Sequence, residues 1–293
     1  MLKQKKLMYF HCNKGKNIFL LIIAIIYATQ VSSQTNRLLL VGDSWAGQQF
    51  TSHIHTDVFN NNGLTNISVV GDTTTIGGSR SSQWIRDENL QLISNALNIN
   101  PSIDTVQITL GGNDILSLWN SGYTLGQENI LFEGIQLNLL TLIEFILNEN
   151  PRIEIVLSFY DYPNFEDTLL RQGCANIFNN MQQPSTERLN SIFIDFEEAI
   201  SEIVNNNPRV YFVSHLGLLQ NFYGFPDENI NPNDIQLPGD ITLPSPVESL
   251  RHFLNGEIDC IHLSNLSYSL IIQNLYDNYF YNRFEEIFSN GFE

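Results

Sequence analysis

LLLVGDSW, residues 38–45, is the stretch of sequence that decides the fold. A short apolar run ends at Gly42 and passes directly into a Gly-Asp-Ser turn. Short apolar runs bounded by turn residues are typical of strands that are buried on both faces of a parallel sheet. The stretch therefore predicts a first central strand with a serine, Ser44, just past its carboxyl end.

Four further runs of the same kind follow along the chain. They are NISVVG at 66–71, DTVQITLGG at 104–112, IEIVLSFY at 153–160 and RVYFVS at 209–214. Other stretches carry apolar residues three or four positions apart, which predicts helices. These stretches are 81–98, 125–149, 185–206 and 264–288. The alternation of strands and helices predicts an α/β fold with a mostly parallel five-stranded sheet and right-handed crossovers.

Residues 222–258 interrupt this alternation. The segment contains five prolines and no strong helix or strand pattern. A long loop in a compact domain is usually functional or disordered. We interpret the segment as a Pro-rich excursion beside the functional site, because it leads directly to Asp259.

Residues 1–33 are typical of a secretory signal peptide. Five lysines precede the apolar run IFLLIIAIIYA at 18–28, and small polar residues follow it. The run is shorter than the roughly 20 apolar residues that a membrane span needs. We expect cleavage after Ser33, a single domain over 34–293 without a stable membrane span, and a secreted or periplasmic protein. An uncleaved N-terminal anchor is the alternative.

The chain that follows residue 33 is strongly acidic. Its nine cationic residues are all Arg and face 31 Asp and Glu, so its net charge is −22. Such a surface repels phosphate backbones and anionic lipid headgroups. We therefore expect no nucleic-acid partner, and we attribute the charge to solubility.

Three short motifs place reactive side chains at strand ends or in the last loop. Ser44 follows the first strand, GGND at 111–114 places Asn113 after the third, and DCIH at 259–262 precedes the last helix. In an open α/β sheet, ligands bind at the carboxyl ends of the strands. Asp259 and His262 are three residues apart, so a turn or helical conformation can bring them together. Each motif alone is also explained by a turn or a helix cap.

Taken together, the motifs resemble those of the SGNH, or GDSL-like, serine hydrolases. VVGDTT at 69–74 supplies the remaining block of that family in its expected position, and the resemblance spans residues 38–275. Four ordered blocks are a specific signal, whereas any one of them would be weak. The resemblance implies a flavodoxin-like three-layer αβα fold and hydrolysis of carboxylic esters without a cofactor or metal. The chain has GDSW where many members have GDSL, which leaves the substrate class open.

The resemblance also implies a catalytic triad. Ser44 would be the nucleophile, His262 the general base, and Asp259 the carboxylate that orients the base. A carboxylate that holds one ring nitrogen, while the other nitrogen faces a hydroxyl, is the arrangement that activates a serine.

An oxyanion hole is implied by the same family pattern. The backbone N–H groups of Ser44 and Gly71 and the side chain of Asn113 would stabilise the developing negative charge. Gly71 is chosen because it ends the second predicted strand. Gly78, in GGSRSSQW, is the alternative.

Several substrates and functions stay open at this stage. Lipid or short-chain acyl esters, acetylated polysaccharide and thioesters all fit the triad. An acyltransferase would use the same residues with an alcohol acceptor, and product analysis with added acceptor would reveal it. A catalytically silent binding protein of the same fold would show sugar or lipid binding without turnover.

The remaining cysteines and one histidine cluster suggest two further sites. Cys174 and Cys260 lie in a chain expected to be exported, where disulfides form, so a bridge between them is our hypothesis. His53, His55 and Asp57 could bind a metal, but no second ligand cluster is visible, and we favour a surface turn.

Three other side chains have no assigned role. Trp45 either shapes the mouth of the pocket beside Ser44 or packs under the first helix. His215 and His252 have no partner that the sequence identifies.

Overall fold

Five strands form the central sheet in the order β2-β1-β3-β4-β5, and all neighbouring pairs are parallel. The strands are β1 (Thr35–Gly42), β2 (Ile67–Val70), β3 (Thr105–Thr109), β4 (Glu154–Ser158) and β5 (Val210–Val213). Residues 34–205 and 207–284 are described by this computed structural model, so the predicted signal peptide lies outside them. The sheet agrees with the five strands expected from the sequence.

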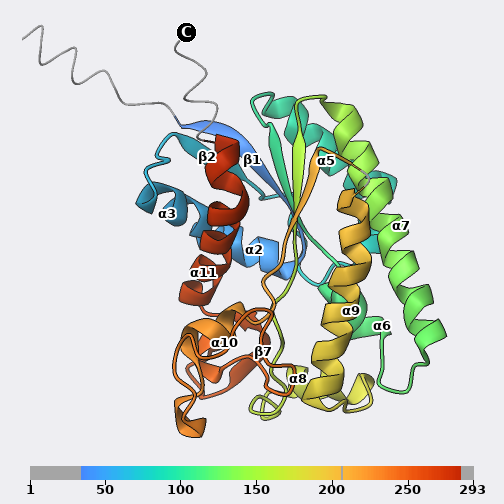
Figure 1. The fold of residues 1–293 in the computed structure, drawn as a ribbon. Coiled ribbons are helices and arrows are strands. Elements are labelled where there is room, and N and C mark those ends of the chain that lie inside the picture. Colours follow the sequence, from blue (N-terminus) through green and yellow to red (C-terminus); the bar gives the residue numbers. More distant parts are fainter. Residues whose placement is uncertain (1–33, 206, 285–293) are drawn as a thin grey trace, which may run out of the picture. The chain divides into compact units, whose positions relative to one another are not determined.

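Helices cover both faces of the sheet. The main ones are α2 (Ser44–Thr51), α3 (Ile54–Asn61), α5 (Asp87–Ile99), α6 (Gly112–Leu118), α7 (Leu125–Glu149), α8 (Gln172–Asn180), α9 (Thr186–Asn205) and α11 (Asn265–Leu275). Helices α2, α3 and α11 lie on one side of the sheet, and α5, α7 and α9 lie on the other (Figure 1). Because crossovers are right-handed, the reversal of direction between the first crossover and the later ones places their helices on opposite faces. The predicted three-layer αβα fold is confirmed.

The helix predicted at 81–98 is broken into α4 (Ser81–Trp84) and α5. Trp84 is fully buried, and its indole N–H donates to the hydroxyl of Ser79 at 2.9 Å. Asp87 and Glu88 occupy the first turn of α5, where acidic side chains favour a helix N-terminus. Periodicity alone did not reveal this break.

Helix α7 is, among the described residues, the one helix long and apolar enough to cross a membrane by composition. It buries one side against the fold, including Phe132, Ile135, Leu139 and Ile143. Core helices of soluble proteins pass the same test of length and composition. The helix nevertheless leaves large apolar side chains exposed on its other side, among them Leu125, Ile130 and Leu137.

The Pro-rich segment 222–258 begins in the last turn of α10 (Leu218–Tyr223) and leads into a small second sheet. Strand β6 (Leu250–His252) pairs antiparallel with β7 (Ile258–Leu263). The side-chain amide of Gln220 and that of Asn190 both donate to the carbonyl of Leu243, at 2.7 and 2.8 Å. These bonds hold the segment against the domain and position β7.

A disulfide joins β7 to α8. The Sγ atoms of Cys174 and Cys260 are 2.15 Å apart, and the two residues are separated by 86 positions. Cys260 is the residue directly after Asp259. The bond therefore anchors the hairpin next to one of the predicted site residues.

The order of the strands selects one place on the sheet for a site. The chain leaves β1 toward β2 and then returns to the opposite side of β1 to form β3. Ligands bind at the carboxyl ends of strands where the connections diverge in this way. Gly42 of β1 pairs with Thr109 of β3, so the segments that carry Ser44 and Asn113 leave the sheet side by side.

Candidate active site

Ser44 is the first residue of α2, directly beyond the end of β1. Asp43 caps this helix, and its Oδ1 accepts a hydrogen bond from the backbone N–H of Trp45 at 2.9 Å. The first N–H groups of a helix have no partner within the helix and carry partial positive charge. The Ser44 hydroxyl therefore lies where a negative charge would be stabilised.

His262 connects Ser44 to Asp259. Its Nε2 lies 2.8 Å from Ser44 Oγ, and its Nδ1 lies 3.1 Å from Asp259 Oδ1. With an ionised carboxylate at Nδ1, that nitrogen carries the hydrogen and Nε2 is left to accept the hydrogen of the serine hydroxyl. The His262 side chain keeps 19% of its surface exposed, whereas that of Asp259 keeps 2%. The imidazole is thus reachable from solvent and its carboxylate is not.

Asp259 is held by several donors. Its Oδ1 also accepts from the backbone N–H of His262 at 3.0 Å, and its Oδ2 accepts from Arg251 Nη2 at 2.7 Å. Arg171 Nη2 lies 3.7 Å from the same Oδ2. Burial raises the pKa of Asp259, but the hydrogen bonds from His262 and Arg251 outweigh it and hold the pKa well below its ordinary value. The carboxylate therefore stays ionised.

The DCIH segment does not have the turn or helical conformation expected from its spacing. Asp259 and His262 both belong to strand β7, where residues three apart would point to opposite faces. They meet because Asp259 Oδ1 accepts from the backbone N–H groups of Ile261 and His262, which folds the side chain back along the strand. A local Asx-type contact thus replaces the expected helical one.

Trp45 links the nucleophile helix to this strand. The side chain is buried, and its indole Nε1 donates to the carbonyl of Ile261 at 2.9 Å. Its ring stacks on Tyr160 with centroids 4.4 Å apart. Of the two alternatives raised by the sequence, packing describes Trp45, and this packing sets Ser44 and His262 at a defined separation.

Asn113 lies between the Ser44 segment and the segment after β2. Its Nδ2 donates to Asp43 Oδ2 and to the carbonyl of Ser79, both at 3.2 Å. Asp43 Oδ2 also accepts from the hydroxyl of Tyr160 at 2.8 Å. Burial raises the pKa of Asp43 to about 7, although the bonds from Tyr160 and Trp45 act in the opposite direction. Both distances to Asn113 are at the long end of the range for N–H···O bonds.

Gly71 is not beside Ser44, which corrects the prediction for this residue. Val70 pairs with Leu39, so Gly71 is level with Leu40, two residues before the end of β1 and four before Ser44. A Cβ atom on Gly71 would lie 3.0 Å from the Phe50 ring. Strand β2 thus ends before it reaches the level of Ser44, and the chain pairs with the end of β1 only later, at Thr75.

Residues after this block return to the edge of the sheet next to Ser44. Thr75 forms an isolated parallel bridge with Gly42, and the backbone N–H of Ile76 donates to the carbonyl of Gly42 at 2.8 Å. A Cβ atom on Gly77 would lie 4.0 Å from that of Ser44, and one on Gly78 would meet no atom within 4 Å. Gly77 therefore borders the nucleophile, and Gly78, the alternative from the sequence, is the next residue along the chain.

A second hydroxyl–imidazole pair occurs in the core. Ser158 Oγ lies 2.9 Å from His215 Nε2, and Asn274 Nδ2 lies 2.9 Å from His215 Nδ1. Both Ser158 and His215 are buried, and burial lowers the pKa of His215 to about 3. No carboxylate contacts this imidazole among the described residues, so the pair has the character of a core contact.

His55 is part of the core rather than of a surface turn, in contrast to our expectation. It is 1% exposed, and its Nε2 lies 2.7 Å from Gln107 Oε1. His53 and Asp57 are exposed. Burial lowers the pKa of His55 to about 4, against a smaller opposing effect of Gln107. Within the described residues, the one cluster of three metal-binding side chains is Cys174, Asp259 and Cys260, which contains the disulfide.

The wild-type protein is expected to lose stability as the pH falls below 6.5, and the variant His55→Gln is expected to lose less. The folded state binds no proton at His55 until about pH 4, whereas the unfolded state does so near its ordinary value of 6.5. Acidification between these values therefore favours the unfolded state, and at pH 5 this residue costs about 2 kcal/mol. Urea unfolding of both proteins at pH 7 and pH 5 measures this difference, and identical pH dependence would contradict it.

Comparison with solved structures shows a shared fold. A provisionally assigned platelet activating factor from Streptococcus pneumonia is 16% identical, with 90% of this chain and 98% of that chain covered and a TM-score of 0.52. A lipase from a goat rumen metagenome (14% identity, coverage 83% and 97%, TM-score 0.48) and a GDSL-like lipase from Bacteroides thetaiotaomicron (16%, 87% and 94%, 0.42) are more distant in structure. No protein-family model and no curated protein matches the sequence. The chain thus shares its fold with the first of these structures.

Proposed function

We propose that the chain is a serine hydrolase that cleaves carboxylic esters through an acyl-enzyme on Ser44. The observation that carries the proposal is the continuous contact from Ser44 Oγ to His262 Nε2, at 2.8 Å, and from His262 Nδ1 to Asp259 Oδ1, at 3.1 Å. A hydroxyl, an imidazole and an ionised carboxylate in this order are the parts that nucleophilic acyl transfer requires.

The reaction follows from this arrangement. His262 accepts the Ser44 proton while Ser44 Oγ forms a bond to the ester carbonyl carbon. The tetrahedral intermediate collapses, the bond to the alcohol oxygen breaks, and His262 gives its proton to the departing alcohol. Water then attacks the acyl-enzyme with His262 as base, which releases the carboxylic acid and restores the serine. Asp259 keeps the imidazole in the productive tautomer and stabilises its charged form.

The oxyanion is proposed to bind at the start of α2. The backbone N–H of Ser44 would donate to it, together with a backbone N–H of Gly77 or Gly78 in place of Gly71. Asn113 would turn one of its two hydrogens from a protein acceptor to the oxyanion, because a charged acceptor forms the stronger bond. Each such donor contributes about 10²–10³-fold in rate.

A fluorophosphonate probe and a panel of p-nitrophenyl esters test the proposal. The probe forms a stable bond with an activated serine, so we expect mass spectrometry of the digested protein to find it on Ser44. We expect turnover of at least the shorter esters, with p-nitrophenol released in a burst if deacylation is slow. Labelling of another residue, or no labelling and no turnover, would remove Ser44 from this role.

Arg251 is expected to position Asp259. In Arg251→Met, Asp259 loses its strongest contact on Oδ2, and we expect kcat to fall about tenfold with little change in KM, since Arg251 supports the carboxylate and not the substrate. The pKa of Asp259 rises when the cation is removed, so activity is lost at higher pH during acidification than in the wild type. The pH profile of kcat measures this shift, and Arg251→Lys should restore part of it.

Arg209→Met is the matched control for this experiment. It removes one positive charge at the amino ends of the strands, opposite the carboxyl ends where Ser44 lies, and Arg209 there donates to the carbonyl of Pro151. Its pH profile should match that of the wild type. If Arg251→Met lowers kcat equally at every pH, Arg251 supports only the hairpin and does not act through the charge of Asp259.

Export to an oxidising compartment is proposed as well. Residues 1–33 have the pattern of a signal peptide, and the Cys174–Cys260 disulfide fits an extracellular or periplasmic location. Expression of the full chain followed by sequencing of the exported protein's N-terminus tests this idea. A start near Gln34 is expected, and retention of residues 1–33 on the membrane would favour the anchor.

A further inference from the structure

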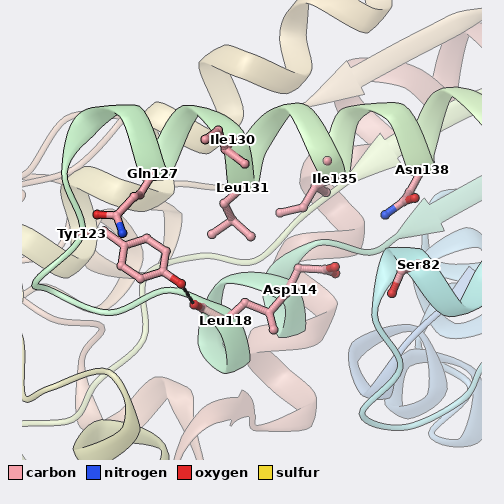
Figure 2. A pocket seen from close by; sticks show the side chains of 10 residues that line it. Ser82, Asp114, Leu118, Tyr123, Gln127, Ile130, Leu131, Ile135 and Asn138 are labelled. Carbon is pink, nitrogen blue, oxygen red and sulfur yellow. Dashed lines mark hydrogen bonds between the residues drawn. The ribbon is translucent and has the colours of Figure 1, made fainter.

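A cavity of about 460 Å³ is lined by residues of α4, α6 and α7 (Figure 2). Its size is within the range of roughly 300–1,000 Å³ for small-molecule sites. The residues that line it are Ser82, Asp114, Leu118, Tyr123, Gln127, Ile130, Leu131, Gly134, Ile135 and Asn138. Figure 2 shows Leu131 and Ile135 between Tyr123 and Gln127 at one end and Ser82 and Asn138 at the other, with Asp114 on the opposite wall from Ile135.

Two adjacent residues of α6 connect the cavity to the Ser44 segment: Asn113 contacts Asp43, and Asp114 lines the cavity. Asn113 donates to the carbonyl of Ser79 on the nucleophile side. The next residue, Asp114, accepts from the backbone N–H and the hydroxyl of Ser81 on the cavity side, at 2.9 and 2.8 Å. The start of α6 therefore contacts the nucleophile segment through Asn113 and lines the cavity through Asp114.

The polar side chains at the cavity are largely engaged within the protein. Both carboxylate oxygens of Asp114 bind Ser81, and Asn138 Nδ2 donates to the Ser81 hydroxyl at 3.0 Å. At the other end, the Tyr123 hydroxyl donates to the carbonyl of Leu118 at 2.7 Å, and Gln127 Oε1 caps α7. A sugar placed against Leu118, Leu131 and Ile135 would leave the hydroxyl groups on that side without partners, which is costly. An aliphatic chain would not.

We propose that this cavity binds the acyl chain of the ester substrate, and the idea rests on the hydrolase function proposed for Ser44. The substrate class is then an ester of a medium-length aliphatic acid. The carbonyl lies at Ser44, and the chain passes over Asn113 and Asp114 to lie against Leu118, Leu131 and Ile135. Acetylated polysaccharide, whose acyl group is too short to reach the cavity, becomes the weaker alternative.

Gly134 offers a way to fill the cavity without disturbing the fold. It lies inside α7, and a Cβ atom on it would meet no other atom within 4 Å. Leucine also favours a helix more than glycine does, so Gly134→Leu is expected to fold at least as well as the wild type. Gly126→Leu is the matched control, because Gly126 lies in the same helix, does not line the cavity, and has similar free space.

The test compares kcat/KM for p-nitrophenyl acetate and octanoate. Each CH₂ group removed from water contributes about fourfold, so wild-type protein should prefer octanoate. We expect Gly134→Leu to lower kcat/KM for octanoate at least tenfold and to change that for acetate less than twofold. Gly126→Leu should change neither. Ile130→Glu, which places a charge at the exposed rim, should repeat the selective loss if Gly134→Leu misfolds.

Binding of decanoate, measured by calorimetry, separates this inference from the hydrolase proposal. The wild type should bind decanoate, and Gly134→Leu should bind it at least tenfold more weakly, whether or not any ester is cleaved. Turnover with equal losses for acetate and octanoate in Gly134→Leu would overturn the acyl site and leave the hydrolase intact. The acyl site would also be overturned if the cavity variants changed the preference for the alcohol part of the ester and left the preference for acyl length unchanged. Absence of turnover and of probe labelling, with decanoate bound, would reject the hydrolase alone.

Discussion

Ser44→Ala is expected to lower kcat for ester hydrolysis by about 10⁴–10⁶-fold, the largest effect of any single change in this chain. The methyl group cannot form the acyl-enzyme, so neither half of the reaction has its nucleophile. KM should change little, because the substrate is held by other groups. Steady-state kinetics on the p-nitrophenyl ester with the highest wild-type rate, combined with loss of fluorophosphonate labelling, measure the effect.

Ser158→Ala is the control for this substitution, because Ser158 also contacts an imidazole. His215, its partner, is buried and is predominantly neutral at pH 7, since burial lowers its pKa to about 3. We expect Ser158→Ala to lower stability by about 1–3 kcal/mol, because a buried ring nitrogen loses its partner, and to retain turnover. If Ser44→Ala retained activity and Ser158→Ala abolished it, Ser158 and His215 would be the catalytic pair, and Ser44 and His262 would form only a structural contact.

Asp259→Asn is expected to lower kcat by about 10³–10⁴-fold, the second largest effect. The amide keeps the shape of the carboxylate but can donate a hydrogen to Nδ1, which then directs the imidazole hydrogen toward Ser44. The imidazole is thereby held in the wrong tautomer, and its charged form loses a stabilising partner. Kinetics at several pH values measure the loss, and a partial recovery at high pH is expected if hydroxide replaces the general base.

Glu257→Gln provides the corresponding control in the same hairpin. It removes one negative charge two residues before Asp259, and no contact between its side chain and His262 is present in the described structure. Its activity should equal that of the wild type. A loss in Asp259→Asn below about tenfold would mean that the backbone of the hairpin positions His262 without help from this carboxylate.

The triad candidates could be identified from sequence because each lies in a short, local pattern. Ser44 follows an apolar strand, and His262 and Asp259 share one four-residue motif before the last helix. Local patterns survive in the sequence because strand length, turn residues and side-chain period act over a few positions. The conformation of that last motif was nevertheless mistaken, since it depends on pairing with β6 (Leu250–His252), which lies outside the motif.

Gly71 shows where sequence reasoning failed. VVGDTT resembles the family block, but the position of a strand's end relative to its neighbour depends on register, which is set by pairing with β1. The chain reaches Gly42 again only at Thr75, so the glycine beside Ser44 is Gly77. The pair Gly77-Gly78 is visible in the sequence, but a single sequence gives no reason to prefer either glycine to Gly71.

No pattern in the sequence identified Arg251 and Arg171 as partners of Asp259. They are 8 and 88 residues from Asp259, and they approach it from the hairpin and from the segment before α8. Their charges matter only because the fold buries the carboxylate between them. The cavity beside Asp114 is of the same kind, since it forms between three helices that are separate in sequence.

The sequence by itself determined the layered α/β architecture, the chain order of the reactive residues and the place of Ser44 at a strand end. These depend on periodicity and turn chemistry, which act between neighbours along the chain. Only the tertiary structure decided which glycines border the nucleophile, which cations hold Asp259, and where an aliphatic chain can lie. Those features depend on strand register and helix packing, in which residues far apart in the chain exclude water from a shared space.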